Sequence, residues 1–538
     1  MQYSNHENMY ARWASEEEIK SSLYETNFNK TNPQYGGIPL FAGSGSVYVD
    51  ASDTHSLIIG STGSKKTRLI AMPALRLYAM AGESFIATDP KAELYERTLP
   101  LLKEQGYHVF VLNLRDPLCS NCWNPLAIPY YLYHNGRRDK AVELVNDMAS
   151  CIMKEDYVRE PYWQNSASDL LAGLILILFE CGEENQIHFK SLQALRTQAF
   201  RMTENNNIPF IRDHFLTHLD AASFVCSLLS GTAEVCNDTR SCIVSHFDQA
   251  MRPFFSQNNL IDMLSGNDLE MGSIGKEKAA VFLITPDENT LYHPLVSVFV
   301  KQCYTGLIIE AQKQPSKKLP RRVNFLLDEF SSLPQISDFP SMITASRSRN
   351  IRFNLFVQSF MQLQAKYGIY AETIKGNCEN LLFLHSREFP LLEELVSLSG
   401  TKYRDYPLVS VSMLQTLDKD KGEAFVLHKR KYPFIASLPD IDLYPVSSHE
   451  EGYAYPENAR KAQSVFNIAR FCRDNNAFFL SNLFAGKTLE EIRNIPRDEE
   501  ERFYMVSDDE ILEPIFTSRI PSDDELKEIM KKREIEEI

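Results

Sequence analysis

The chain has 538 residues and a net charge of −15, from 56 basic and 71 acidic residues. This length predicts roughly three domains, and 44% hydrophobic with 24% charged residues is typical of a folded globular protein rather than a disordered chain. The acidic balance argues against a protein coated by nucleic acid but is compatible with a local basic channel. The longest apolar run, residues 170–180, is shorter than the about 20 residues of a membrane span. Because the N-terminus also lacks an apolar signal core, we expect a cytoplasmic protein.

Short apolar runs alternate with helical segments from residue 56 onward. Strands are expected at 56–60, 84–89 and 107–114, and a helix at 66–81 that stops at Gly82. A strand, a loop, a helix and a further strand in this order are typical of an α/β fold with a mostly parallel sheet.

Helical periodicity replaces this alternation from residue 134 to 236 and predicts an inserted all-α domain. Four later apolar runs predict strands that complete the sheet, at 279–285, 322–330, 352–359 and 380–386. A terminal hairpin is expected over 423–438. The predicted domains are a lead-in over 1–37, an α/β domain in two halves over 38–133 and 237–445, the all-α insertion over 134–236, and an acidic helical appendage over 446–538.

A phosphate-binding loop is expected where the first strand meets its helix. The stretch GSTGSKKTR, residues 60–68, follows the pattern of glycine, four residues, glycine, lysine and Ser or Thr, except that Lys65 stands at the second glycine. In such a loop, backbone N–H groups at a helix N-terminus hold an anion, the lysine reaches the terminal phosphates and the hydroxyl binds Mg²⁺. Taken alone, the stretch is equally compatible with a charged helix start. The expected nucleotide-binding residues are Gly60, Ser61, Thr62, Gly63, Ser64, Lys65, Lys66, Thr67 and Arg68.

An acidic pair in the second half supplies the other groups that nucleotide hydrolysis needs. The apolar run VNFLL ends in Asp328 and Glu329. We expect this strand to lie beside the loop strand and to present its acids at the carboxyl end, where open parallel sheets bind ligands. Asp328 would then hold Mg²⁺ together with Thr67, and Glu329 would polarise the attacking water. The alternative is a strand that merely ends in solvated acids.

The next strand adds a neutral amide and a basic turn. The run RFNLFV ends in Gln358, which suits a γ-phosphate sensor or a group that orients water. Just before the strand, Arg347, Arg349 and Arg352 fall within six residues. One of these arginines is a candidate arginine finger acting across a subunit boundary, or all three line a DNA path. A solvated basic turn is the alternative.

Several longer stretches extend the pattern beyond a phosphate loop. In chain order they are ARWASEEEI (11–19), ATDPKAELYERT (87–98), WNPL (123–126), YWQNSASDLLAGL (162–174), TRSCIVSHFDQAMRPF (239–254), FLLDEFSSLPQI (325–336) and RSRNIRFNLFVQSFMQLQAKYG (347–368). With these stretches the chain resembles the type IV secretion coupling proteins, the TraG-like and TraD-like ATPases of bacterial conjugation. DPKAELYE resembles a family segment after the second strand, with Ala92 where glycine is usual. The similarity runs from about residue 11 to 439.

The resemblance implies a RecA-like P-loop NTPase domain that carries the all-α insertion and assembles as a homohexamer around a channel. Family members use ATP and Mg²⁺ to hand a relaxase bound to single-stranded DNA to the components of a type IV secretion channel. By position, Lys66, Thr67, Asp328, Glu329 and Gln358 match family roles, and Arg347 matches the arginine finger, with Arg349 as a nearby substitute. The expected enzyme is therefore an ATPase of the DNA-translocase type.

Two departures from the family pattern leave alternatives open. The usual N-terminal membrane helices are absent, which indicates a soluble form, cytoplasmic or peripheral at the inner face of the cell membrane, or one that depends on a separate membrane-anchor protein. Lys65 brings a Cβ and a long cationic side chain to a glycine position. A receptor that binds nucleotide without hydrolysing it is therefore the second hypothesis, and a hexameric motor of another branch is the third.

The sequence makes two further predictions about partners. DNA contact should be made to the backbone, without sequence preference and with strong salt dependence, because a motor must accept any sequence. The acidic segment 502–538 is a candidate site for a basic cargo protein, against the alternative of a solvated helical tail.

Overall fold

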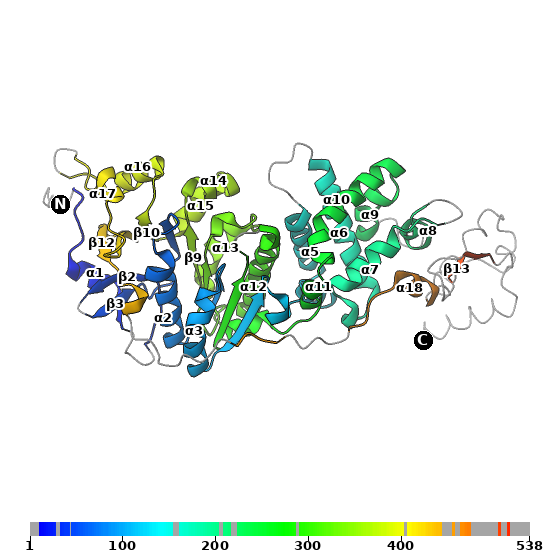
Figure 1. Cartoon of the computed structure of the whole chain (residues 1–538), viewed down its shortest axis with the longest axis horizontal. Coiled ribbons are helices and arrows are strands. Elements are labelled where there is room, and N and C mark those ends of the chain that lie inside the picture. Colours follow the sequence, from blue (N-terminus) through cyan, green and yellow to red (C-terminus); the bar gives the residue numbers. More distant parts are fainter. Residues whose placement is uncertain are drawn as a thin grey trace. The chain divides into compact units, whose positions relative to one another are not determined.

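The computed structural model comprises two compact units, each built from two stretches of the chain (Figure 1). The sheet unit combines Met1–Trp123 with Asn267–Ala459, and the helical unit combines Asn124–Gly266 with Arg460–Ile538. The structure describes residues 10–27, 33–43, 45–153, 161–203, 208–216, 223–286, 290–402, 406–443, 454–457 and 463–474, and the backbone alone for 504–506 and 514–516.

The sheet unit is organised around a nine-stranded sheet with the order β12-β11-β10-β4-β9-β8-β5-β7-β6. The strands from β10 to β6 in this order run parallel, and β11 and β12 form an antiparallel hairpin at one edge. This confirms the predicted α/β fold with a mostly parallel central sheet. The strands are β4 (Ser56–Gly60), β5 (Ser84–Thr88), β6 (His108–Asn113), β7 (Ala279–Ile284), β8 (Val323–Leu327), β9 (Ile351–Val357), β10 (Asn380–His385), β11 (Glu423–His428) and β12 (Phe434–Ser437).

One predicted neighbour in the sheet is wrong. The strand that leads to Asp328, β8, does not lie beside the loop strand β4, because β9 pairs with β4 on one side and with β8 on the other. The strand that ends next to Gln358 therefore lies between the phosphate loop and the acidic pair.

Helices bury both faces of the sheet, which explains why its inner strands are apolar throughout. Every residue of β4, β5, β8 and β9 is buried. On one face Tyr95 of α3 packs edge-on against Phe282 of β7, and on the other Phe339 of α13 packs against Phe353 of β9. The helices are α1 (Glu16–Ser22), α2 (Met72–Ala81), α3 (Glu93–Glu104), α12 (His293–Lys313), α13 (Phe339–Ser346), α14 (Phe360–Tyr367), α15 (Tyr370–Asn377), α16 (Phe389–Leu398) and α17 (Val411–Gln415).

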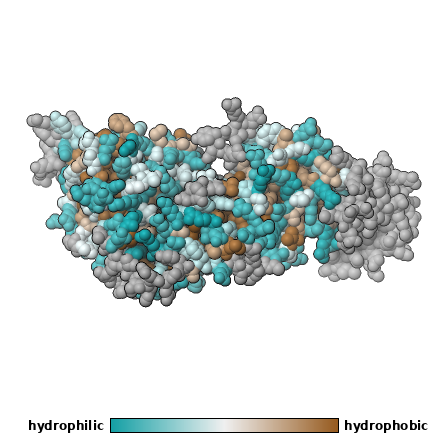
Figure 2. Space-filling model, in the orientation of Figure 1, coloured by the Kyte–Doolittle hydropathy of each residue, from teal (hydrophilic) through white to brown (hydrophobic). Residues whose placement is uncertain are grey.

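Apolar side chains also reach the surface of this unit. Phe389 and Leu398 of α16 and Met413 of α17 are exposed. Figure 2 shows small hydrophobic areas scattered over a mostly hydrophilic face of the molecule. Scattered exposure of this kind is ordinary for a folded protein.

The lead-in folds as part of the sheet unit rather than as a separate segment. The helix α1 begins with a capping box, in which Ser15 accepts from the backbone of Glu18 and the Glu18 carboxylate accepts from the backbone of Ser15. The strands β1 (Tyr24–Thr26), β2 (Pro39–Gly43) and β3 (Ser46–Val49) form a small antiparallel sheet in the order β1-β3-β2. The boundary predicted at residue 37 therefore falls inside this sheet, because β1 pairs with β3 across it.

The helical unit consists of helices in its described residues up to Gly266, as predicted for the insertion, but it extends beyond 134–236 at both ends. The stretch 239–254, which resembles the return into the α/β domain, forms α10, and this helix packs on α5, α6 and α9 instead. The reason is its buried apolar side, which includes Ile243, Phe247 and Met251. The helices are α4 (Ala127–His134), α5 (Arg138–Met153), α6 (Pro161–Cys181), α7 (Phe189–Ala199), α8 (Phe210–His214), α9 (Phe224–Ala233), α10 (Asn237–Phe255) and α11 (Asn258–Met263).

The run 170–180 lies in α6, where the residues from Leu170 to Phe179 are all buried. Within the described part of the chain, no helix has both the length and the apolar character needed to cross a membrane.

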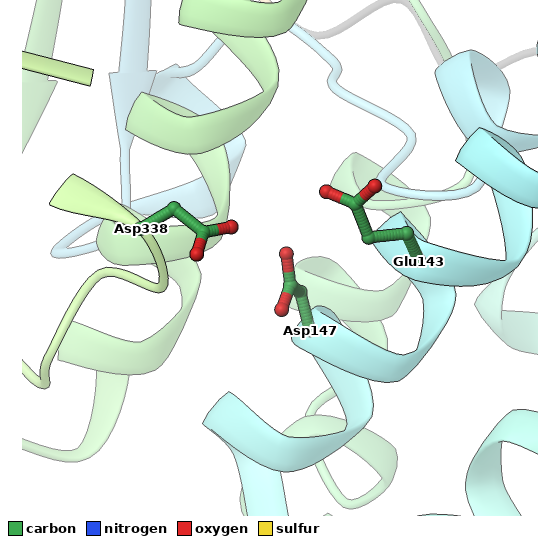
Figure 3. Close-up of side chains that lie close together, drawn as sticks. All are labelled: Glu143, Asp147 and Asp338. Atoms are coloured by element: carbon green, nitrogen blue, oxygen red, sulfur yellow. The ribbon is translucent and has the colours of Figure 1, made fainter. Parts of the chain in front are cut away.

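The helix α5 carries two acidic side chains on one side. Glu143 and Asp147 lie one turn apart and project from the same side of the helix (Figure 3).

The described parts of the predicted appendage pack on both units. In the sheet unit, the Tyr455 hydroxyl donates to Glu96 (2.9 Å) and its ring packs on Tyr95. In the helical unit, α18 (Ile468–Asp474) follows Phe466, whose backbone N–H donates to the Ser191 hydroxyl (3.0 Å). Two short strands, β13 (Tyr504–Val506) and β14 (Pro514–Phe516), pair where only helix was predicted. The rest of the proposed cargo segment 502–538 lies outside the described residues.

We expect replacement of His55 to change how stability depends on pH. This buried ring accepts from the Phe353 backbone N–H (2.9 Å) at Nδ1 and donates to the Ile343 carbonyl (2.8 Å) from Nε2. Burial, and then the charges of Arg347 and Arg352, lower the pKa of His55 from 6.5 to about 3. Below pH 6.5 the unfolded chain binds a proton that the native chain excludes. Stability is therefore lost as the pH falls from 6.5 towards 3, by up to about 1.4 kcal/mol per pH unit.

The measurement is urea unfolding at pH values of about 7.5, 6.5 and 5.5. The His55→Asn variant should be less stable at every pH but should lose less stability on acidification than the unaltered chain. The control is His108→Asn, which changes an exposed histidine at the start of β6 and should retain the original slope. An unchanged slope in His55→Asn would contradict the assignment.

Candidate nucleotide site

The phosphate loop joins β4 to the π-helical turn η2 (Thr67–Ala71), which continues into α2. The predicted helix over 66–81 therefore begins with a widened turn, a feature frequently found at functional sites. Lys66 is buried, and its Nζ donates to the Gly60 carbonyl across the loop. Gly63 has a φ of +80°, the left-handed conformation that a glycine adopts without strain.

Lys65 has a left-handed backbone, the conformation that glycine adopts most easily. Its φ is +63°, which costs a non-glycine residue roughly 1–3 kcal/mol. Its Nζ donates to Asp420 (2.9 Å), in the turn before β11, so the side chain leaves the loop on the side of the terminal hairpin. Thr62, in the same loop, contacts Gln358 on the opposite side, next to β9. The lysine therefore does not intrude on the acidic pair.

The acidic pair lies at the carboxyl end of β8. The Thr88 hydroxyl, at the end of the neighbouring β5, donates to the Asp328 carbonyl (3.0 Å). Burial and the charge of Glu329 raise the pKa of Asp328 to about 6, while the charge of Lys66 acts in the opposite direction. A buried carboxylate beside a second acid is stabilised by a cation, and carboxylate and hydroxyl oxygens are ligands that Mg²⁺ prefers. Asp328 is therefore chemically suited to hold a Mg²⁺ ion at the carboxyl end of β8.

Gln358 links the loop to Glu329. Its Nε2 lies 2.8 Å from each Glu329 carboxylate oxygen, and its Oε1 accepts from the Thr62 hydroxyl (3.3 Å). Glu329 has a left-handed backbone, with a φ of +52°. The structure thus brings together three sequence candidates, which follow the ends of β4, β9 and β8.

The candidate arginines lie at the opposite ends of the strands from the phosphate loop. Arg347 and Arg349 form η9 (Arg347–Arg349) at the amino end of β9, whereas the loop lies at the carboxyl ends of the strands. The seven residues of β9 separate these edges by roughly 20 Å. Arg347 pairs with Glu379 (2.7 Å), and Arg349 donates to the Lys317 carbonyl (3.0 Å). Neither arginine reaches the nucleotide site of its own chain, so a finger role requires a second chain.

Arg352 is neither a finger nor part of a DNA path. It is 3% exposed on β9, and its guanidinium contacts Glu83 (2.5 Å) and Asn324 (2.7 Å). A side chain buried in this ion pair is a structural element of the sheet. The alternative that all three arginines line a path is therefore wrong.

The side chain of Arg68 also has internal partners. It is held by Asp440 and Asp442 after β12, and the hydrogen bonds that its guanidinium donates to these carboxylates raise the pKa of Arg68. Its side chain is therefore held by two carboxylates of the protein, whereas Lys66 contacts a carbonyl of the loop itself. Ser61 is positioned by β10, since its hydroxyl lies 3.1 Å from His385 Nδ1 and its backbone N–H donates to the His385 carbonyl (2.9 Å).

Sequence reasoning missed His385 and Asp89 as neighbours of the site. Asp89 directly follows β5, accepts from the Tyr95 backbone N–H (2.8 Å) and caps α3. Burial, with a contribution from Asp328, raises the pKa of Asp89 to about 7. Both residues end parallel strands, so the same strand-end rule that selected Asp328 would have found them. The three acids that hold Lys65 and Arg68 carry no such signal.

The chain resembles known proteins over most of its length. A family model described as "Type IV secretory system Conjugative DNA transfer" matches residues 12–388. Protein VirD4 of Agrobacterium fabrum is 24% identical over 385 residues, which cover 70% of this chain and 53% of that protein. The chain spans about half the length of the curated relatives it matches.

Solved structures of the plasmid coupling protein TrwB share the fold. The TrwB complex with the ATP analogue ADPNP has a TM-score of 0.58 and 16% identity, and the match covers 84% of this chain and 97% of that chain. The complex with ADP and Mg²⁺ has a TM-score of 0.57 and 16% identity, covering 81% of this chain and 94% of that chain.

Proposed function

We propose that this chain, which belongs to the type IV secretory system conjugative DNA transfer family, is a nucleotide-driven coupling protein that binds and hydrolyses ATP. The observation that carries the proposal is the bridge from Thr62 through Gln358 to Glu329. This bridge connects a loop suited to phosphates with an acid suited to activating water.

Each residue at this edge has a defined task in the proposed reaction. Lys66 would hold the terminal phosphates, and Asp328 and Thr67 would hold Mg²⁺, which neutralises charge on the transferred phosphoryl group. Glu329 would accept a hydrogen bond from the attacking water, and Gln358 would hold Glu329 in place. TrwB, which has the same fold, was solved with ADPNP and with ADP and Mg²⁺, in agreement with this assignment.

The partners follow from the family. We propose that the chain forms a homohexamer, in which Arg347 or Arg349 of one chain reaches the nucleotide of the next, because neither reaches its own. It would receive a relaxase bound to single-stranded DNA and deliver it to components of the secretion channel. We propose that this work takes place in the cytoplasm or at the inner face of the cell membrane. DNA would be bound through its backbone, without sequence preference.

A second candidate function is a receptor that binds nucleotide without hydrolysing it. The φ of +63° at Lys65 favours it, because a strained loop can bind phosphates and still misplace them for reaction.

ATP turnover with and without single-stranded DNA tests the proposal and separates the two functions. We expect turnover that DNA stimulates and that Lys66→Ala reduces by roughly 10²–10³-fold, since one preorganised charge is removed from the phosphates. Lys421→Ala, which changes an exposed lysine near β11, should have no effect. Equal turnover in Lys66→Ala would contradict the motor function. No turnover in the unaltered chain, restored by Lys65→Gly, would favour the receptor.

A further inference from the structure

Three carboxylates that flank the terminal hairpin contact the side chains of Lys65 and Arg68 in the phosphate loop. Asp420 lies just before β11, and Asp440 and Asp442 lie after β12. Because Glu423 pairs with Ser437, the start of β11 and the end of β12 lie side by side. Since β10 runs antiparallel to β11 and parallel to β4, they lie next to the carboxyl ends of β10 and β4, where the loop begins. We call these three residues the acidic clamp.

The clamp holds the two cations of the loop in different ways. Arg68 contacts both Asp440 oxygens and one oxygen of Asp442, with 34% of its own side chain exposed and 24% of that of Asp440. Lys65 makes a single contact of 2.9 Å with Asp420, whose side chain is 75% exposed. Forked, partly buried contacts persist, whereas a single exposed lysine pair exchanges readily with other anions. Arg68 is therefore an anchor, and Lys65 is the exchangeable member.

A nucleotide would compete directly with Asp420 for Lys65. Lys65 lies in the loop proposed to surround the phosphates, directly before Lys66, so the root of its side chain is already at the proposed site. The lysine stem is flexible and its ammonium is a compact point charge, which lets it change partners without moving the loop. Triphosphate oxygens carry more charge than one exposed carboxylate.

We propose that Lys65 and Asp420 form an exchangeable ion pair that sets the affinity of the loop for nucleoside triphosphates. Binding of the phosphates draws Lys65 away from Asp420 and releases the turn 418–422 from the loop. The inference rests on the proposed nucleotide site and adds Asp420 to it as a residue that acts through Lys65.

The turn is built so that Asp420 can be changed without unfolding it. The Asp418 carboxylate accepts from the backbone of Asp420 (2.9 Å), and the Asp418 backbone N–H donates to Glu423 (2.9 Å). None of these bonds uses the Asp420 side chain. Asp420→Asn should therefore preserve the turn and remove only the charge that competes for Lys65.

The test is a double-mutant cycle on the full chain, with affinity for the Mg²⁺ complex of ADPNP measured by calorimetry. The variants are Asp420→Asn, Lys65→Asn and the pair, because asparagine tolerates a positive φ. Asp420→Asn should tighten binding about two- to five-fold, the range of an exposed ion pair, and should have no effect in the Lys65→Asn background. Glu393→Gln, which removes an exposed acid on α16, should leave the affinity unchanged.

Two outcomes would overturn the inference alone. Equal tightening in both backgrounds would mean that Asp420 acts only through general electrostatics. Unchanged or weaker binding in Asp420→Asn would mean that the pair is a permanent brace. If the unaltered chain does not bind the complex at all, the proposed nucleotide site fails, and this inference fails with it.

Trypsin provides an independent readout of the released turn. Lys419 and Lys421 are exposed and flank Asp420. Adding ADPNP and Mg²⁺ should accelerate cleavage at these two lysines in the unaltered chain and leave its rate unchanged in Lys65→Asn. Nucleotide that slows cleavage, or acts equally in both chains, would contradict release of the turn.

Discussion

We expect Glu329→Gln to bind ATP and Mg²⁺ as tightly as the unaltered chain, while ATP hydrolysis falls by roughly 10²–10⁴-fold. Both carboxylate oxygens of Glu329 accept from Gln358 Nε2, and a glutamine keeps one acceptor for this bond. The side chain should therefore stay in place while it loses the charge that polarises water. A large effect on rate and a small effect on binding is the result expected of a group that acts on the reaction itself.

Asp328→Asn provides the matched comparison. It changes the neighbouring acid in the same manner, but its proposed partner is Mg²⁺ rather than water. We expect a higher Mg²⁺ requirement for nucleotide binding in Asp328→Asn and an unchanged requirement in Glu329→Gln. Single-turnover hydrolysis and Mg²⁺ titration of nucleotide binding measure the two effects. If Glu329→Gln hydrolyses ATP at the original rate, Glu329 does not activate water in this chain.

A variant of Gln358 tests whether hydrolysis depends on the bridge from Thr62 to Glu329 in addition to the Glu329 carboxylate itself. Gln358→Ala removes the contact with Thr62 and the contact with Glu329 in one change. If the bridge holds the acid in its reactive position, this variant should show slower hydrolysis with little change in affinity. The strained left-handed backbone of Glu329 makes such support necessary, because the residue cannot relax into an ordinary strand end.

The sequence predicted the positions of the strands and of the polar residues that follow them, for a physical reason. Strands buried on both faces are continuous apolar runs, and the first polar residue after each run marks the ligand-binding edge. Asp328 and Gln358 were found in this way. The order of the strands was not predictable by this rule, because pairing depends on contacts between distant segments. The position of β9 between β4 and β8 is therefore a finding of the structure.

The errors have equally specific causes. The apolar side of α10 is compatible with packing on a sheet or on other helices, so its periodicity does not reveal which domain it joins. Arg352 was grouped with Arg347 by spacing, although β9 begins at Ile351 and buries it. Lys65 and Asp420 are 355 positions apart, and no local pattern connects them.

Arg352 gives the largest expected effect on stability. Its guanidinium lies against the Glu83 carboxylate, which is itself only 6% exposed, and Asn324 contacts both partners. We expect Arg352→Met to lower the free energy of unfolding by about 3–5 kcal/mol, because it leaves a buried carboxylate short of its main partner. Chemical denaturation of the full chain measures this change. Arg349→Met, which changes a partly exposed arginine of η9 just before β9, is the control and should cost far less.

A second variant distinguishes the loss of the charge pair from a packing defect. Combining Arg352→Met with Glu83→Gln removes the buried charge as well as its partner, so it should recover part of the stability lost in Arg352→Met alone. No recovery would show that the cost comes from packing. Single-stranded DNA binding, measured well below the unfolding transition, should be the same in Arg352→Met and the unaltered chain. Weaker DNA binding by a folded Arg352→Met variant would contradict its burial in the sheet and return it to the candidate DNA path.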